Sequence, residues 1–211
     1  MAGGSAYALI VAIGDDNEIG AFRCAERELR GGLMSTKESR AREVLAILYR
    51  AWAVAQLSAP AAVQGAFIPA GNAFDAMVAV GKVLQTTTKD VLLVDPYMDE
   101  KALTDFAVQA PAAVTIRLLA DHGAHKPSLK PAVKRWVAQH GATRPLEARL
   151  APTRTLHDRL IAVDGSGVWI LTQSLNAFAA RSPATIVRVD PDTAALKIVA
   201  YAAIWQRATT L

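Results

Sequence analysis

Cysteine is almost absent from this chain of 211 residues, because Cys24 is the only one. A single thiol cannot form an internal disulfide, so a disulfide-stabilised secreted scaffold is excluded, and a reducing cytoplasm is the compartment that we expect. Cys24 itself is expected to be a small, partly buried apolar residue.

Long apolar runs are also missing, although 52% of the residues are hydrophobic. The longest candidate, residues 42–57, is interrupted by arginines and a glutamine and is therefore unsuited to crossing a bilayer. The apolar stretch 6–14 lacks the preceding basic residues of an export signal, and acidic residues follow it. We expect a chain without a transmembrane segment, and we expect a strand over residues 6–14.

Several phosphate-binding and hydrolase motifs are missing as well. No G-x-G-x-x-G follows an expected strand, no Walker A sequence occurs, and no G-x-S-x-G elbow surrounds a serine. Dinucleotide, nucleoside-triphosphate and α/β-hydrolase chemistry are thereby set aside. The formal charge of +4 is a mild basic excess, which permits an anionic partner such as nucleic acid or phospholipid without requiring one.

The sequence does contain a regular alternation of helix and strand patterns from about residue 70. Apolar periodicity predicts helices over 72–87, 99–110, 130–141 and 192–208, and strands over 90–95, 113–120, 145–151, 159–164, 167–172 and 184–190. Asp99 is expected to cap the second of these helices. The alternation predicts an α/β fold, with a mixed β-sheet flanked by helices.

The first third of the chain differs in character. A long amphipathic helix is predicted between Ser35 and Pro60. Its arginines, among them Arg40, Arg42 and Arg50, are interpreted as a solvated face, with nucleic-acid contact as the alternative. We expect an N-terminal, mainly helical extension with one strand over residues 1–65 and the α/β domain over residues 66–211.

The most informative stretch is HDRLIAVDGSGVWILTQSLN, residues 157–176. Side chains alternate along a strand, so His157 and Arg159 share one face, as do Ser174 and Asn176 if their stretch remains extended. An imidazole, a guanidinium, a hydroxyl and an amide placed together suit a tetrahedral phosphate. The alternative is an exposed pair on an edge strand, but the downstream serine and asparagine favour the phosphate site.

This arrangement resembles the signature of the phospholipase D superfamily, H-x-K-x4-D followed by G-S-x-N. The matching residues are His157, Arg159, Asp164, Ser174 and Asn176. The stretch VLLVDPYMDEKAL, residues 91–103, is similar to an early strand and D-P-Y turn of bacterial members, and HDRLIAVD is similar to their single-motif "HDR" subtype. The resemblance covers roughly residues 70–210.

The resemblance implies a phosphodiesterase that needs no metal or other cofactor. His157 would attack phosphorus to form a phosphohistidine, while a second histidine protonates the leaving oxygen and then activates water. Because the motif occurs once, the second histidine would come from another subunit, which implies a homodimer. Arg159 and Asn176 would hold the phosphate oxygens, Ser174 would orient the phosphate, and Asp164 would support the site through hydrogen bonds.

Two departures from the signature leave another function open. Arg159 replaces the lysine, and Gln173 stands where the family has glycine. Arginine is longer and planar, so this exchange is not conservative at a tight site. The expected enzyme acts on nucleic acid, with phospholipid as the lesser alternative. The competing hypothesis is a degenerate module that binds phosphate-bearing ligands or partner proteins without turnover.

Four further residues are expected to contact substrate: Asp95, Tyr97, Lys126 and Lys130. Asp95 ends a strand, where it lines the cleft or forms a structural turn. Tyr97 stacks on a base or packs in the core. Lys126 and Lys130 belong to a basic cluster that is either a rim for a polyanion or a solvated face. The loop that contains His122 and His125 lacks further ligands, so no metal site is expected there.

Overall fold

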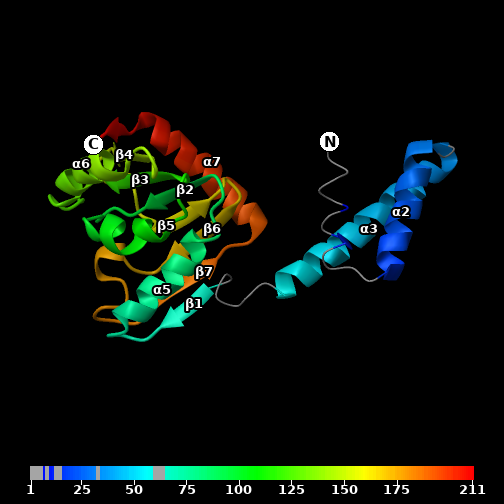
Figure 1. The fold of residues 1–211 in the computed structure, drawn as a ribbon, viewed down its shortest axis with the longest axis horizontal. Coiled ribbons are helices and arrows are strands. Elements are labelled where there is room, and N and C mark those ends of the chain that lie inside the picture. Colours follow the sequence, from blue (N-terminus) through cyan, green and yellow to red (C-terminus); the bar gives the residue numbers. More distant parts are fainter. Residues whose placement is uncertain (1–6, 8–9, 12–15, 32–33, 59–64) are drawn as a thin grey trace. The chain divides into compact units, whose positions relative to one another are not determined.

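The computed structural model describes residues 7, 10–11, 16–31, 34–58 and 65–211 (Figure 1). These residues fall into two compact units, one within residues 1–60 and the other within residues 61–211. None of the helices in the described part of the chain is long and apolar enough to span a membrane.

The first unit is built from two helices, α2 (Asp16–Gly31) and α3 (Met34–Ser58). Phe22 of α2 and Ile47 of α3 are buried in one small apolar cluster together with Ile10. Tyr7, Ile10 and Val11 are helical, so the strand predicted over residues 6–14 is wrong at the residues described there. A short apolar run fits a buried helix as well as a strand, and Ile10 packs against helices rather than a sheet.

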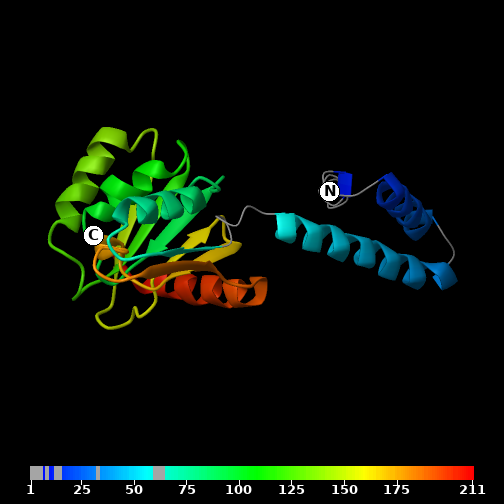
Figure 2. The same ribbon diagram turned by 90° about the horizontal axis from the view of Figure 1, so that it is seen from below.

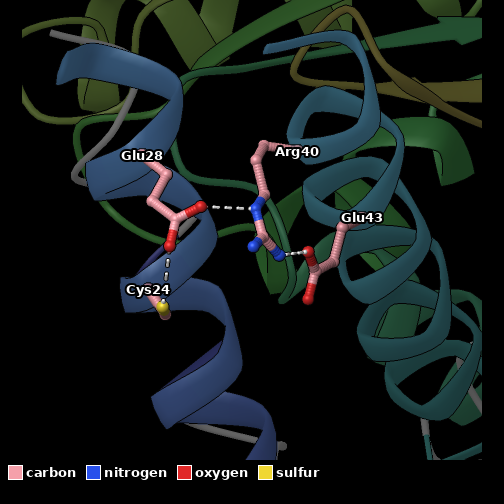
Figure 3. A network of polar contacts seen from close by, with 4 residues as sticks. All are labelled: Cys24, Glu28, Arg40 and Glu43. Atoms are coloured by element: carbon pink, nitrogen blue, oxygen red, sulfur yellow. Dashed lines mark hydrogen bonds and ion pairs between the residues drawn. The ribbon is translucent and has the colours of Figure 1, made fainter. Parts of the chain in front are cut away.

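Arg40 links the two helices through a pair of carboxylates (Figure 3). Its Nε donates to Glu28 of α2 at 2.6 Å, and its guanidinium also donates to Glu43, 2.6 Å away on α3. The hydrogen bond to Glu43, followed by that to Glu28, raises the pKa of Arg40 above its ordinary value.

Cys24 is exposed, with its Sγ 3.7 Å from Glu28, so its predicted partial burial is wrong. Arg42 and Arg50 also pair with carboxylates, those of Glu38 and Glu18.

The second unit contains an eight-stranded sheet in the order β1-β7-β6-β5-β2-β3-β4-β8. The strands are β1 (Gly65–Ile68), β2 (Asp90–Val94), β3 (Thr115–Asp121), β4 (Leu146–Ala151), β5 (Leu160–Val163), β6 (Gly167–Leu171), β7 (Ala184–Arg188) and β8 (Thr209–Thr210). Strands β2, β3 and β4 are parallel, and the other pairings are antiparallel. The predicted α/β class with a mixed sheet is confirmed.

Helices cover both faces of this sheet. On one face lie α5 (Ala73–Leu84) and α6 (Leu129–His140), and on the other lies α7 (Pro191–Arg207), drawn in orange and red in Figure 2. Buried Leu129, Val133 and Trp136 recur at helical spacing along α6 and join the larger apolar core. The start of α7 is fixed by Asp190, whose side chain accepts a hydrogen bond from the Thr193 amide at 2.9 Å.

The segment predicted as a helix over residues 99–110 is helical in part, but it is not an α-helix. Residues Ala102–Phe106 form a π-helix and Ala107–Gln109 a 3-10 helix. The side-chain amide of Gln109 donates to the Asp105 carbonyl at 2.6 Å, and so occupies the acceptor that an α-helix would offer to the Gln109 backbone. Asp99 accepts a hydrogen bond from the Lys101 amide at 2.9 Å, so it does bind the start of this segment.

The sheet topology brings three separate segments to one edge. Strand β5 is antiparallel to β2, with Val94 opposite Leu160, and β6 is antiparallel to β5, with Leu160 opposite Ile170. The residues that follow β2, precede β5 and follow β6 therefore meet at the same end of the sheet. These are the segments that carry Asp95, His157 and Ser174.

Candidate functional site

Asp95 is the structural centre of this sheet edge. It follows β2 and is wholly buried, with none of its surface exposed. One carboxylate oxygen accepts the Tyr97 amide at 2.9 Å, and the other accepts the Ser174 hydroxyl at 2.6 Å and the Leu175 amide at 2.7 Å. A buried carboxylate is costly unless donors surround it, and three donors do so here. Asp95 thus holds the segment after β6 against the end of β2 and has no surface left for a substrate.

Asn176 is held beside the same turn. Ser174 is extended, but Leu175–Ala177 form a 3-10 helix, so the condition under which Ser174 and Asn176 would share a strand face is not met. The Asn176 side-chain amide donates to the Tyr97 carbonyl at 3.0 Å. The hydrogen bond from the Leu175 amide to Asp95 favours this tight turn over a continued strand.

Arg159 lies next to Tyr97. Its guanidinium carbon is 5.5 Å from the centroid of the Tyr97 ring, and Tyr97 is 42% exposed, so this tyrosine is not a core residue. The Nε of Arg159 is buried without a hydrogen-bond partner among the described residues. A guanidinium without a carboxylate partner is suited to bind an anion.

His157 is exposed two residues before Arg159. Leu156 and Leu160 belong to the apolar cluster beneath α7, and Asp158 between them bonds to Lys197 of α7. This alternation places His157 and Arg159 on the other side of the segment, as the strand period predicts. Within the described part of the chain, no residue forms a hydrogen bond with the His157 ring.

Asp158 joins the motif to α7. Its carboxylate accepts a hydrogen bond from Lys197 and another from Tyr201. Burial acts to raise the pKa of Asp158, but these bonds outweigh it and hold the pKa below its ordinary value. Burial, followed by the adjacent Asp158 charge, raises the pKa of the Tyr201 hydroxyl well above its ordinary value. Lys197 and Tyr201 lie about 40 residues further along the chain, so no local pattern in the sequence indicates this link between Asp158 and α7.

Asp164 lies at the far end of β5 and is not brought to His157. Its oxygens accept the Thr88 hydroxyl at 2.7 Å and the backbone amides of Thr88, Lys89 and Asp90 at 2.7–3.2 Å. Burial acts to raise the pKa of Asp164, but these hydrogen bonds hold it below its ordinary value. Asp164 therefore supports the start of β2, and the structure gives it no contact with the other motif residues.

Gln173 occupies the position where the signature has glycine. Its side-chain nitrogen donates to Ser182 and to the Pro183 carbonyl at 2.8–3.1 Å, and its oxygen accepts the Ala179 amide at 3.2 Å. The side chain is thus directed into the loop 174–183, which it closes. It fixes the loop that contains Ser174 and Asn176 instead of covering them.

A second buried aspartate, which sequence reasoning did not single out, holds the segment leading to His157. Asp121, 3% exposed at the end of β3, accepts the Gly123 amide at 2.8 Å and the Arg154 amide at 2.7 Å. His125 bonds to the Asp121 carbonyl through Nδ1 at 2.9 Å. An aspartate at a strand end followed by a turn was the available signal.

The two predicted lysines are both exposed but differ in position. The Lys126 amide donates to the Met98 carbonyl at 2.9 Å, so its backbone lies beside the turn after β2. Lys130 lies in the first turn of α6. A surface cavity of about 550 Å³ lies away from this edge, between α6 and β4. The described residues contain no group of three or more potential His, Cys, Asp or Glu metal ligands.

Comparison with known proteins identifies the fold. No family model matches the sequence, and no curated protein matches it either. Among solved structures, Nuc from Salmonella typhimurium, a phospholipase D family member, matches with a TM-score of 0.53 and 17% identity over 70% of this chain and 96% of that protein. NucT from Helicobacter pylori matches with a TM-score of 0.51 and 6% identity, over 70% of this chain and 98% of NucT. The strand and helix unit described over residues 65–211 therefore shares its fold with these two proteins.

Proposed function

We propose that this protein is a metal-independent phosphodiesterase that cleaves nucleic acid through His157. One observation carries the proposal: the exposed His157 imidazole and the Arg159 guanidinium, which forms no ion pair among the described residues, lie at the sheet edge where buried Asp95 holds Tyr97 and Ser174. This arrangement keeps the reacting groups in place before the substrate binds, which is what efficient catalysis requires. The fold of residues 61–211 is consistent with this assignment.

The chemistry proceeds in two balanced steps. A nitrogen of the His157 ring forms a bond to phosphorus while the bond from phosphorus to the leaving oxygen breaks, and a protonated second imidazole donates its proton to that oxygen. The second imidazole then takes a proton from water, whose oxygen attacks phosphorus and releases His157. Arg159 and Asn176 bind the nonbridging oxygens in both steps.

A second copy of the chain supplies the second imidazole. The motif occurs once, and His140 at the end of α6 lies at the opposite edge of the sheet, where it packs against Trp136. A two-fold axis would place the His157 rings of two copies on opposite sides of one phosphorus. The active species in this proposal is thus a homodimer.

Cations at the same edge support a polyanionic substrate. Lys126 and Arg154 are both exposed, on the loops that follow β3 and precede His157. The backbone of each is fixed at this edge, Lys126 by the Met98 carbonyl and Arg154 by the Asp121 carboxylate. Exposed cations beside a phosphate site bind the flanking phosphates of a nucleic acid strand.

The test uses the purified full chain with labelled single- and double-stranded DNA, RNA and phosphatidyl substrates in EDTA. We expect cleavage of a nucleic acid, and we expect His157→Ala to abolish it, while the control His140→Ala retains it. Mixing His157→Ala with wild-type chains should lower the activity in proportion to the heterodimer formed. Wild-type activity in His157→Ala refutes the histidine mechanism, and a fully active monomer refutes the shared site.

A second candidate function is binding of phosphate-bearing ligands without turnover. It is favoured by the internal hydrogen bonds of this turn: the Ser174 hydroxyl donates its one proton to Asp95, and one of the two N–H groups of Asn176 donates to the Tyr97 carbonyl. In that case nucleic acid binds to the wild-type chain and no product forms. Arg159→Ala then weakens binding, whereas His157→Ala leaves it nearly unchanged.

A further inference from the structure

Strand β1 is an outermost strand of the sheet, and its outer edge is open. On its inner side it pairs with β7. No strand in the described part of the chain pairs with the outer side, so alternate backbone N–H and C=O groups there have no partner strand. Charged residues, proline or a bulge commonly protect such an edge, but residues 65–68 are Gly, Ala, Phe and Ile. The edge of β1 is thus able to accept another strand.

A groove lies along this edge, between β1 and α5 (Figure 1). Its cavity of about 270 Å³ is lined by residues 66–69 and by Val78 and Ala79 of α5. Asp75 and Lys82 complete the lining. Both are exposed, and neither forms an ion pair with a described residue. The groove therefore has apolar walls and one unpaired charge of each sign.

The two charges lie toward opposite ends of the groove. The turn of residues 69–72 reverses the chain, so α5 runs back along β1, with Asp75 near the end of the strand and Lys82 near its start. Seven residues of helix separate the two charges by about 10.5 Å. Ile68 is buried in the core with residues of α5, whereas Phe67 points to the other face of the sheet and is 68% exposed. A strand added beside β1 would therefore direct every second side chain into the groove.

We propose that this groove binds an extended segment of a partner protein, which adds to the sheet beside β1. In antiparallel pairing, the commoner and slightly more stable kind, the segment carries a cation, an apolar residue and an anion at alternate positions, in that order. The cation meets Asp75, the apolar side chain enters the cavity beside Val78, and the anion meets Lys82. The cation and the anion are four residues apart, about 14 Å in a strand, and their long side chains cover the difference from the helix spacing.

The groove adjoins a loop of the candidate site. The amide of Gly71, in the turn after β1, donates to the Ala179 carbonyl at 2.9 Å. Ala179 belongs to the loop 174–183, which contains Ser174 and Asn176, so a partner bound at β1 is held beside this loop. The proposal does not depend on the proposed chemistry, because its test measures binding and needs no substrate.

A membrane surface is the other occupant that exposed aromatic residues suggest, and the charges argue against it. Phe67 and Phe74 are 68% and 70% exposed. Interfacial segments border such residues with lysine and arginine. Residues 65–81 contain neither, and Asp75 directly follows Phe74. The open backbone edge and the charges of opposite sign instead favour a peptide.

The probe for this groove is the fluorescein-labelled peptide Ser-Lys-Thr-Val-Thr-Glu-Ser, titrated with the full chain and followed by fluorescence anisotropy. We expect saturable binding. The same peptide with proline in place of valine should bind about tenfold more weakly, because proline cannot donate to a strand ladder.

Charge reversal at Lys82 tests the predicted contact with the anion. Lys82→Glu should weaken binding of the valine peptide about fivefold, since an attraction between exposed charges becomes a repulsion. The matched control Lys134→Glu makes the same change at an exposed lysine of α6 and should bind like the wild-type chain. The peptide Ser-Lys-Thr-Val-Thr-Lys-Ser should show the reverse preference and bind Lys82→Glu about fivefold more tightly than the wild-type chain. Circular dichroism and thermal melting establish that both variants are folded.

Three results overturn the proposal: no saturable binding, equal affinities for the valine and proline peptides, or equal affinities of Lys82→Glu and Lys134→Glu. In a chain that binds no peptide, binding to vesicles of phosphatidylcholine and phosphatidylglycerol that is lost in Phe74→Glu assigns the surface to a membrane. Self-association that is lost in Phe67→Lys assigns it to a second copy. Peptide binding without any phosphodiester cleavage refutes only the proposed function.

Discussion

Replacing Asp95 tests the frame of the site independently of any activity. Asp95→Ala removes the acceptor of three hydrogen bonds, of which the one from the Leu175 amide is fully buried. Leaving a buried amide unpaired costs about 1–3 kcal/mol, and each partly buried donor can turn to water at a lower cost of about 1 kcal/mol. We therefore expect a loss of about 4 kcal/mol in the free energy of unfolding.

Asp95→Asn has a smaller expected effect because the amide keeps one acceptor oxygen. In either orientation its NH₂ group faces a backbone N–H, that of Tyr97 or that of Leu175, so one hydrogen bond is replaced by a repulsive contact. The expected cost is about 2 kcal/mol. For a domain of this size, one kcal/mol shifts the melting temperature by about 2–4 °C, so we expect a shift of about 4–8 °C for Asp95→Asn and roughly twice that for Asp95→Ala.

Thermal unfolding followed by tryptophan fluorescence measures these shifts, since Trp136, Trp169 and Trp205 all lie buried in this domain. The control is Asp99→Asn, which alters the one hydrogen bond that the Asp99 side chain accepts from the Lys101 amide, and should cost no more than about 1 kcal/mol. If Asp95→Ala melts within about 2 °C of the wild-type protein, the carboxylate does not hold the two segments together.

Two further substitutions separate the roles of the motif residues. Arg159→Lys replaces a planar fork with a point charge, so phosphate affinity, measured by titration calorimetry with a short oligonucleotide, should fall if Arg159 binds two oxygens; unchanged affinity excludes a bidentate contact. Asp164→Asn should lower stability most at neutral pH, since the pKa of Asp164 is lowered in the folded state and its contribution disappears as the pH falls below about 4. Urea midpoints at pH 7 and pH 3 measure this difference, and an equal loss at both values contradicts it.

Most of the sheet could be predicted from the sequence because its strands carry continuous or alternating apolar runs. The four residues of β1 and the two of β8 were not predicted, since neither stretch has a period and each pairs only with a strand distant in sequence. The side-by-side placement of His157 and Arg159 follows from strand alternation alone. The 3-10 turn at Asn176 does not, because it depends on a hydrogen bond between the Leu175 amide and Asp95, 80 residues earlier.

The surroundings of Asp95 and Asp164 depend on contacts between segments that are distant in sequence. Asp95 was expected to line the cleft or form a turn, and its burial is set by the neighbouring strands, which a local pattern does not report. Asp164 forms part of a recognisable signature, but the turn after β5 directs its carboxylate to Thr88–Asp90. A sequence motif shows which residues are present, but the positions of the strand ends in the sheet determine which of those residues lie close together.

The bond between Asp158 and α7 has a consequence for engineering and for genetic selection. The three residues of the HDR motif have different roles. Asp158 in the middle bonds to Lys197 and Tyr201 of α7, whereas His157 and Arg159 lie at the sheet edge. Transplanting the motif into another scaffold therefore requires α7 as well, because the tripeptide alone would lose its anchor. In a selection that begins from a substituted Asp158, compensating changes are expected on α7 at positions 197 and 201, far along the sequence from the motif they restore.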